Sequence, residues 1–368
     1  MLYHITTAEA WAEHTGDYRP PSLESEGFIH LSFAQQRRLT QQRYYTEREG
    51  LILLRIDPAA LPEPPRIENG FPHLYSSLPR AAVIDASPLA AYRDLSVALL
   101  SRVYPERDNR LEQDLATIRA DLVVLPELPL NPWSPATQTA REDDVDDWRS
   151  SCLSRAAAGA GKAVLGGVIE ATLSDTPRRP PQGGALAGRR NTAYLWGPDG
   201  KSCLRYEKMH LPHEPGFWET HHYQPGVEAP RVSDQLGFPL GVQLCSDTNR
   251  PFGSLALQAQ GAAAIIIPRA TEKATFGRWR RIFQALAQIT ACYVLSVNRP
   301  HPEAGVPLGG PSIVVRPDGE VLVESDDPVV HLTLEHSKVV AARGGYPGYL
   351  DFPLEVYASA WGELLTRG

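Results

Sequence analysis

Cysteine is scarce in this chain of 368 residues, and its four cysteines include no CxxC pair. We therefore expect neither a disulfide framework nor a cysteine-ligated zinc site, and free thiols indicate a reducing cytoplasm. No apolar run approaches the ~20 residues that span a bilayer. The first residues, MLYHITTAEAW, lack a basic region followed by an apolar core, so no signal peptide is expected. A formal net charge of -7 gives no reason to expect nucleic acid or an anionic membrane as a partner.

Several common catalytic motifs are also missing. The sequence has no Gly-x-Ser-x-Gly nucleophile elbow. AAAGAGKA, residues 156–163, lacks the first glycine of a phosphate loop and the Ser or Thr that would bind magnesium. His221 and His222 are adjacent, and neighbouring side chains point in different directions, so they are poor co-ligands for a metal. We expect neither a metal nor a cofactor.

The pattern of elements changes near residues 91–94, which predicts a domain of residues 1–92 and a domain of residues 93–368. The first has short strand-like runs (GFIHLS, LILLRID, AAVIDASPL) around a helix-like run, FAQQRRLTQQRYY, as in a small α+β domain. In the second, apolar strands alternate with amphipathic helices and with two Pro-Asp-Gly hairpins, which predicts layered α/β halves around a pair of mixed sheets. Residues 174–190 are polar and rich in Pro and Gly, which indicates a mobile surface loop or a lid.

The stretch GVQLCSDTNRP, residues 241–251, ends an apolar strand-like run with a thiol at an apparently exposed corner. A helix beginning near Pro251 would direct free N–H groups and the positive end of its dipole at Cys245, and both favour the reactive thiolate. A small buried side chain is the alternative for any single cysteine. Glu127 follows the strand LVVLP, and Lys208 ends the strand CLRYEK. Residues at strand ends meet at one rim of an α/β sheet, where such folds bind ligands.

The three segments LVVLPE, RYEKMHLP and GVQLCSD, in this order, resemble the signatures of the nitrilase or carbon–nitrogen hydrolase superfamily. The resemblance covers about residues 95–368 and implies an αββα four-layer sandwich. It also implies Glu127 as base, Lys208 as cation and Cys245 as nucleophile. The segment HLPHEPGFWETHHYQPG resembles N-carbamoylputrescine amidase-like members, in which a second glutamate follows the lysine. Glu219 fits that position better than Glu214.

The resemblance implies thiol-dependent hydrolysis of an amide or N-carbamoyl compound, with release of ammonia and a thioester intermediate. We expect the Ser246 backbone N–H to help stabilise the oxyanion. Family members usually form dimers, so a homodimer or larger homo-oligomer is expected. The run CSDTNRP departs from the family pattern Cys-x-Asp-x-x-x-Pro-Glu, which leaves the choice of amide, carbamoyl or nitrile substrate open. Candidate substrate-binding residues are Asp247, Arg250, Arg269 and Glu272, and a surface role is the alternative for the last three.

Residues 1–92 resemble a small bacterial domain family of unknown function, DUF952, through YHIT, GFIHLS, LLRIDPAAL, IENGFPHLY and LPRAAV. The H-x-T and HLS runs of that family are similar to those of ADP-ribosyltransferases. This similarity implies a pocket for NAD or another nucleotide, with structural histidines as the alternative. A protein in which this pocket is the main functional site, with a regulatory or bifunctional role, is therefore the second hypothesis. The predicted pocket residues are His4, Thr6, His30, Ser32, His73 and Tyr75.

Overall fold

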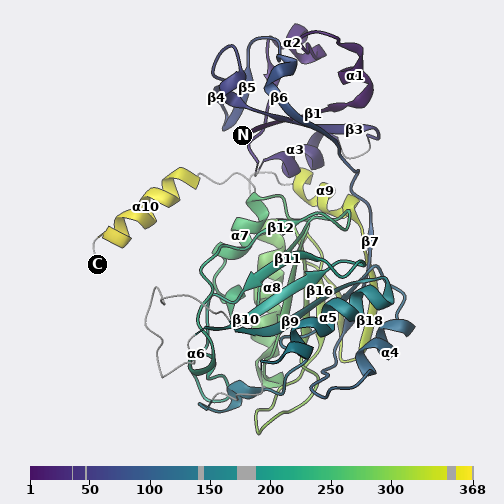
Figure 1. Cartoon of the computed structure of the whole chain (residues 1–368). Helices are drawn as coiled ribbons and strands as arrows, with labels where there is room; N and C mark the ends of the chain where they lie inside the picture. The colour runs from purple at the N-terminus through teal and green to yellow at the C-terminus, as the bar shows by residue number, and fades with distance from the viewer. Residues whose placement is uncertain (35, 46–47, 140–144, 172–187, 346–353, 367–368) are drawn as a thin grey trace.

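The computed structural model describes residues 1–34, 36–45, 48–139, 145–171, 188–345 and 354–366. Two six-stranded sheets lie face to face in the body of the molecule, and helices cover their outer surfaces (Figure 1). This arrangement confirms the predicted αββα sandwich. The N-terminal part carries two further three-stranded sheets above that body (Figure 1). The predicted boundary between residues 92 and 93 falls in the link between these two parts.

The first large sheet has the strand order β11-β10-β9-β8-β7-β18. Its central strands β7, β8 and β9 are parallel, and the flanking pairs are antiparallel. The hairpin β10–β11 turns at Pro-Asp-Gly, as the sequence predicts. The strands span Leu95–Leu100 (β7), Leu122–Val124 (β8), Ala163–Ala171 (β9), Arg189–Trp196 (β10), Ser202–Glu207 (β11) and Val329–Leu334 (β18).

The second large sheet has the order β12-β13-β14-β15-β16-β17. Strands β13, β14 and β15 are parallel, so their carboxyl ends lie at one edge of the sheet. The two halves of the sandwich thus repeat the same plan of a parallel centre with antiparallel flanks. The strands span Val232–Ser233 (β12), Leu240–Val242 (β13), Ala264–Arg269 (β14), Tyr293–Asn298 (β15), Ser312–Val315 (β16) and Val321–Ser325 (β17).

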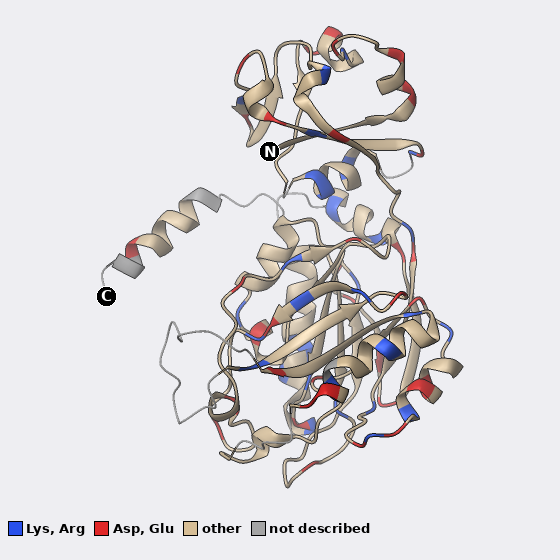
Figure 2. Cartoon of the chain, in the orientation of Figure 1, with Lys and Arg blue, Asp and Glu red and all other residues tan. Residues whose placement is uncertain are grey.

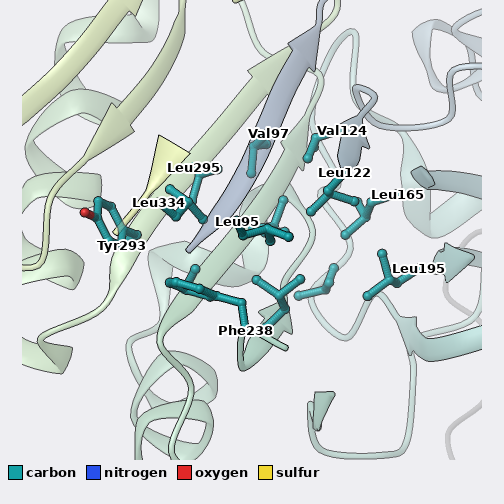
Figure 3. Packing of buried hydrophobic residues seen from close by; sticks show 14 of the residues in the cluster. Leu95, Val97, Leu122, Val124, Leu165, Leu195, Phe238, Tyr293, Leu295 and Leu334 are labelled. Carbon is teal, nitrogen blue, oxygen red and sulfur yellow. The ribbon is translucent and has the colours of Figure 1, made fainter. Parts of the chain in front are cut away.

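Aliphatic side chains from both sheets interdigitate in the middle of the sandwich (Figure 3). Leu122 and Val124 of β8 face this core, whereas Val123 between them faces the helices outside. Strands with apolar residues on both faces are typical of parallel sheets covered on both sides. Burying one such side chain contributes roughly 1.5–3 kcal/mol relative to an exposed one. The packed core therefore fixes the strands and, with them, the positions of the residues at their ends.

The outer helices bury apolar stripes at the predicted spacing. On the first sheet, Leu111 and Leu115 of one helix pack with Leu153 of the next. On the second sheet, Trp279 and Phe283 lie on the buried face of the longest helix. None of the described helices has the length and hydropathy needed to cross a bilayer. The helices span Arg110–Thr117 (α4), Asp147–Ala160 (α5), Glu219–His222 (α6), Phe252–Ala259 (α7), Phe276–Thr290 (α8), His336–Gly345 (α9) and Leu354–Thr366 (α10).

The N-terminal part combines the sheets β1-β3-β6 and β2-β5-β4 with short helices. The helix-like run of the sequence forms α3, which lies at the lower side of this part, next to the body (Figure 1). The elements span Leu2–Thr7 (β1), Ala8–Glu13 (α1), Pro21–Ser25 (α2), Ile29–His30 (β2), Arg37–Tyr44 (α3), Leu51–Ile56 (β3), Arg66–Glu68 (β4), Phe71–Leu74 (β5) and Val83–Pro88 (β6).

One expectation about the elements needs correction, and three elements were missed. The loop predicted at residues 174–190 includes Arg189 and Arg190, which belong to β10, because their backbone pairs with the end of β9. Residues 172–187 lie outside the described residues, so the lid is not placed. Strand β18 and helices α9 and α10 were not predicted. Strand β18 pairs with β7 from more than 200 residues away, which no local pattern indicates.

Helix α3 lies at the junction of the two parts of the chain, and Figure 2 shows Lys and Arg positions, in blue, along it. Arg38 Nε donates to Asp234 Oδ2 at 2.9 Å, and Arg38 Nη2 donates to the Val232 carbonyl at 3.1 Å. Gln42 Nε2 donates to the Gly261 carbonyl at 2.8 Å in a buried contact. The N-terminal part is therefore docked on the body through backbone and side-chain contacts.

Gly261 is a sensitive point of this junction. Its φ is +84°, and a Cβ added there would lie 2.6 Å from Arg38 Cβ. We predict that Gly261→Ala lowers Tm because it combines backbone strain with a clash against α3. Gly50→Ala is the matched control, since Gly50 has φ +67° with open space around it and tests strain alone. A thermal melt should show a clearly larger loss for Gly261→Ala, and equal losses would contradict this role for the contact.

Candidate active site

Glu127 lies three residues beyond Val124, the last residue of β8, and is completely buried. The next residue, Leu128, has φ +47°, a left-handed conformation that is costly for a leucine. Arg299 Nη1 donates to the carbonyls of Glu127 and Leu128 at 2.9 and 2.7 Å. Glu303 holds Arg299 in turn through Nε at 2.9 Å and Nη2 at 2.6 Å. A buried arginine thus fixes the turn that presents Glu127.

Lys208 directly follows β11, and its ammonium group lies between two carboxylates. Its Nζ donates to Glu127 Oε1 at 2.7 Å and to Glu219 Oε1 at 2.6 Å, and all three residues are buried. The Gly226 N–H donates to the Lys208 carbonyl at 2.7 Å. A Cβ on Gly226 would lie 2.5 Å from the Glu207 carbonyl oxygen, so only glycine fits this close approach. The lysine backbone is therefore held as firmly as its side chain.

Cys245 follows β13 and begins a 3₁₀ turn, Cys245–Asn249. Its φ of +42° is left-handed, which is uncommon for a non-glycine residue and marks backbone strain. Its Sγ contacts the Ala270 carbonyl oxygen at 3.7 Å. The sequence predicted an exposed corner, but Cys245 is only 4% exposed, because the loops that follow neighbouring strands close around it. The strand-end position was right and the exposure was wrong.

The charges of this cluster act on one another strongly. Burial by itself lowers the pKa of Lys208, but Glu127 and Glu219 outweigh it and hold that pKa well above its ordinary value. Burial, with the charge of Glu127, raises the pKa of Glu219 to about 7 although Lys208 opposes the shift. Burial and then Glu127 also raise the pKa of the Cys245 thiol, against Lys208. The resting thiol is therefore protonated, contrary to the thiolate expected from the helix dipole, because burial dominates.

The turn after Cys245 is tied to the segment after Lys208. Asp247 Oδ1 accepts from the His210 backbone N–H at 2.8 Å, and Oδ2 accepts from the Tyr206 hydroxyl at 2.8 Å. The Ser246 hydroxyl donates to the His210 carbonyl oxygen. For Asp247, these contacts favour a role in holding the two segments together over direct contact with substrate.

The other predicted substrate-binding residues lie in different surroundings. Arg250 is exposed, with Nη1 3.3 Å from the Ser246 carbonyl oxygen, and Glu272 is half-buried. Arg269, at the end of β14, is completely buried and hydrogen-bonded to Ser296, Thr271 and the Pro311 carbonyl. Its side chain is thus engaged with the protein itself.

In the N-terminal part, the six predicted pocket residues form two groups. The His30 and His73 rings meet edge to face with centroids 5.3 Å apart, and Phe28 stacks on His73 at 4.1 Å. The Tyr75 hydroxyl beside them donates to Glu68 at 2.8 Å. The other three contact neighbouring groups: His4 Nδ1 the His30 carbonyl at 2.7 Å, Thr6 the Tyr18 hydroxyl at 2.6 Å, and Ser32 the Thr40 hydroxyl at 3.0 Å. Burial lowers the pKa of His4 to about 4, so its ring is neutral.

Two residues of the site were not assigned from the sequence. Asn191 Nδ2 donates to Glu127 Oε1 at 2.8 Å, so that oxygen accepts from both Asn191 and Lys208. Within the described part of the chain, Oε2 of Glu127 and of Glu219 are buried without a hydrogen-bond partner. Arg299 is the second unassigned residue. Its position directly after β15, a parallel strand of the second sheet, is the sequence signal that could have found it.

Comparisons with known proteins agree with this arrangement. Residues 90–329 match the family model described as carbon-nitrogen hydrolase, and residues 5–86 match the DUF952 family, described as a protein of unknown function. An N-carbamoylputrescine amidase of Solanum lycopersicum is 25% identical over 185 residues, which cover 45% of this chain. The matched stretch spans 62% of that relative's length.

Two solved structures share the fold. A carbon-nitrogen hydrolase from Helicobacter pylori G27 is 20% identical, covers 73% of this chain and 98% of its own, and has a TM-score of 0.63. A mutant amidase from Nesterenkonia sp. AN1 carries the acetamide moiety of fluoroacetamide covalently added at its active-site cysteine. It is 22% identical, covers 72% of this chain and 96% of its own, and has a TM-score of 0.56.

The raised pKa of Glu219 predicts a pH-dependent stability. The pKa is about 7 in the folded chain against an ordinary value of 4.5, so between these values the folded state holds the extra proton. The free energy of unfolding therefore falls as the pH rises through this window. We expect Glu219→Gln to gain at least about 1 kcal/mol relative to wild type between pH 5 and pH 8, measured by chemical denaturation at each pH.

The control for this prediction is Glu214→Gln, which alters an exposed glutamate of the same segment. It should keep the wild-type pH dependence. A constant difference between Glu219→Gln and wild type across this range would show that Glu219 does not titrate there.

Proposed function

Because the chain belongs to the carbon-nitrogen hydrolase family, we propose that residues 93–368 form an amidohydrolase that cleaves a non-peptide C–N bond in a small linear amide or N-carbamoyl compound. Glu127, Lys208 and Cys245 act as base, cation and nucleophile. Support for the substrate class comes from the matched N-carbamoylputrescine amidases and from the amidases that share the fold.

One observation carries the proposal. The Lys208 ammonium, buried between Glu127 and Glu219, belongs to a set of charges that all act on the buried Cys245 thiol. Buried ions are expensive, and strongly shifted titratable groups gather at functional sites. Purely structural stabilisation would be served as well by apolar residues of similar volume.

In the first half of the reaction, Glu127 takes the Cys245 proton, and Oε2 is the oxygen available for it. The sulfur attacks the carbonyl carbon, and a C–S bond forms as the carbonyl π electrons move to oxygen. The Lys208 ammonium and the Ser246 N–H stabilise that oxyanion. Glu127 then gives its proton to the leaving nitrogen as the C–N bond breaks, and ammonia departs.

In the second half, Glu127 removes a proton from water, whose oxygen attacks the thioester carbon. The C–S bond breaks, and the proton returns to the sulfur, so the resting thiol is regenerated. Amide and water are converted to acid and ammonia, with no net change in the protein. Glu219 keeps Lys208 in place throughout, since its Oε1 lies 2.6 Å from Nζ.

An apolar cluster flanks these groups. Leu128 follows Glu127, Ala270 contacts the thiol, and Tyr223 caps the helix that carries Glu219. Such surroundings lower the local dielectric. They exclude water from the thioester except in the space that the departing ammonia has vacated. The homo-oligomer implied by the family and the cytoplasmic location implied by the free cysteines remain predictions, and so does a nucleotide pocket in the N-terminal part.

Cys245→Ala is the direct test. Ammonia release is first measured with N-carbamoyl amines, ω-amides and nitriles, and we expect a carbamoyl or amide compound to be the best substrate. With that substrate the variant should lose about 10⁴-fold or more in kcat while its Tm stays close to wild type. Mass spectrometry of the wild-type chain should show an acyl adduct on the peptide that contains Cys245.

The matched control is Cys152→Ala, which removes a buried thiol from helix α5, outside the candidate site. This variant should keep its turnover. Substantial amidase activity in Cys245→Ala, or an adduct on another cysteine, would refute the proposed nucleophile. A preference for nitriles would refute the substrate class.

A further inference from the structure

Arg269 is completely buried, and its guanidinium donates hydrogen bonds to neutral groups of the protein. Its guanidinium donates to Ser296 Oγ at 2.9 Å, to Thr271 Oγ1 at 2.7 Å and to the Pro311 carbonyl, and these acceptors are all neutral. Phe276 and Phe283 lie beside it, with ring centroids 5.4 and 5.9 Å from Cζ. Among the described residues, no carboxylate forms an ion pair with this side chain. Hydrogen bonds to neutral groups satisfy its donors but leave its charge uncompensated.

Arg269 lies next to the candidate nucleophile. The following residue, Ala270, provides the carbonyl oxygen that Cys245 Sγ contacts at 3.7 Å. Cys245 and Phe283 belong to the same apolar cluster, between the second sheet and helix α8. Burial lowers the pKa of Arg269 to about 10, and the charge of Cys245 raises it. Because the attraction between opposite charges is mutual, a cation at this position also favours the thiolate form of Cys245.

The charges around the thiol explain why a second cation matters. Glu127, Glu219 and Lys208 act on Cys245 from the loops after β8 and β11 and from α6. With both carboxylates ionised, these three groups sum to one negative charge, which opposes a thiolate. When Glu219 is protonated, they sum to zero. Lys208 is therefore fully used by its two carboxylates, and Arg269 on β14 supplies the remaining positive charge.

We propose that Arg269 is a positioning residue for Cys245. The uncompensated charge of Arg269 favours the thiolate, and the hydrogen bonds from Arg269 to Ser296 and Thr271 hold the strand end that contacts the sulfur. This inference rests on the proposed function, since it assumes that Cys245 reacts as a thiolate. The inference gives Arg269 no part in substrate recognition, because its guanidinium is hydrogen-bonded to other groups of the protein. The residue acts through the nucleophile and not on the substrate.

The test measures the thiolate directly. The wild-type chain and Arg269→Met are treated with chloroacetamide, a neutral reagent, from pH 6 to pH 11, and mass spectrometry follows the peptide that contains Cys245. Methionine fills similar volume among Phe276 and Phe283 and removes the charge, so the fold is expected to survive. Without the cation the pKa of the Cys245 thiol rises. At a pH below the midpoint of both curves of alkylation rate against pH, we therefore expect Cys245 in Arg269→Met to react at least about tenfold more slowly than in the wild-type chain. Arg269→Lys keeps a charge and should stay close to the wild-type profile.

Arg343→Met is the matched control, because Arg343 is also buried beside a thiol, with Nη2 3.7 Å from Cys292 Sγ. It should leave the Cys245 profile unchanged. A wild-type profile for a folded Arg269→Met would overturn the inference and leave the proposed function intact. If Arg269→Met does not fold, Arg269→Gln replaces it, and the same criterion applies. A Cys245 that is not alkylated in the wild-type chain at any of these pH values would instead count against the proposed nucleophile.

Discussion

The rest of the site depends on one buried ammonium, Lys208, shared by two carboxylates. At 4 Å and an effective dielectric of 20, each attraction is worth about 4 kcal/mol, while removing each ion from water costs several kcal/mol. Such a cluster is favourable only when the groups are held in place. The structure meets this requirement through the backbone: Gly226 supports the lysine, and Arg299 fixes the turn at Glu127. The ion pairs in turn restrict the conformations of the loops that carry these residues.

The sequence identified the residues that end strands, because that information is local. Apolar runs followed by Glu127, Lys208 and Cys245 are visible without tertiary contacts, and so is the alternation of strands and helices. Burial is a global property, and therefore the sequence overestimated the exposure of Cys245 and its thiolate character. Asn191 was missed for a similar reason: its amide reaches Glu127 only after β10 is paired between β9 and β11.

The N-terminal part is connected to the site through the second sheet. Arg38 of α3 donates to the carbonyl of Val232 in β12, which is the edge strand of that sheet. Strand β12 pairs with β13, and β13 leads within three residues to Cys245. An uncovered edge strand invites pairing with other chains, so the contact with α3 protects the edge strand that pairs with β13. Whatever else the DUF952-like part does, it stabilises this edge.

The neutral resting thiol is compatible with the proposed chemistry because Glu127, the charge that opposes its ionisation most, is also the proposed base. While Glu127 is ionised, its charge raises the pKa of the thiol and keeps sulfur protonated. Once the proton moves to Glu127, that carboxylate becomes neutral and no longer opposes the thiolate. Lys208 then has one less anion to balance and can attract the sulfur and the oxyanion. In the proposed reaction, proton transfer to Glu127 thus removes the largest charge that opposes the thiolate, and the buried thiol becomes a nucleophile only when its proton moves.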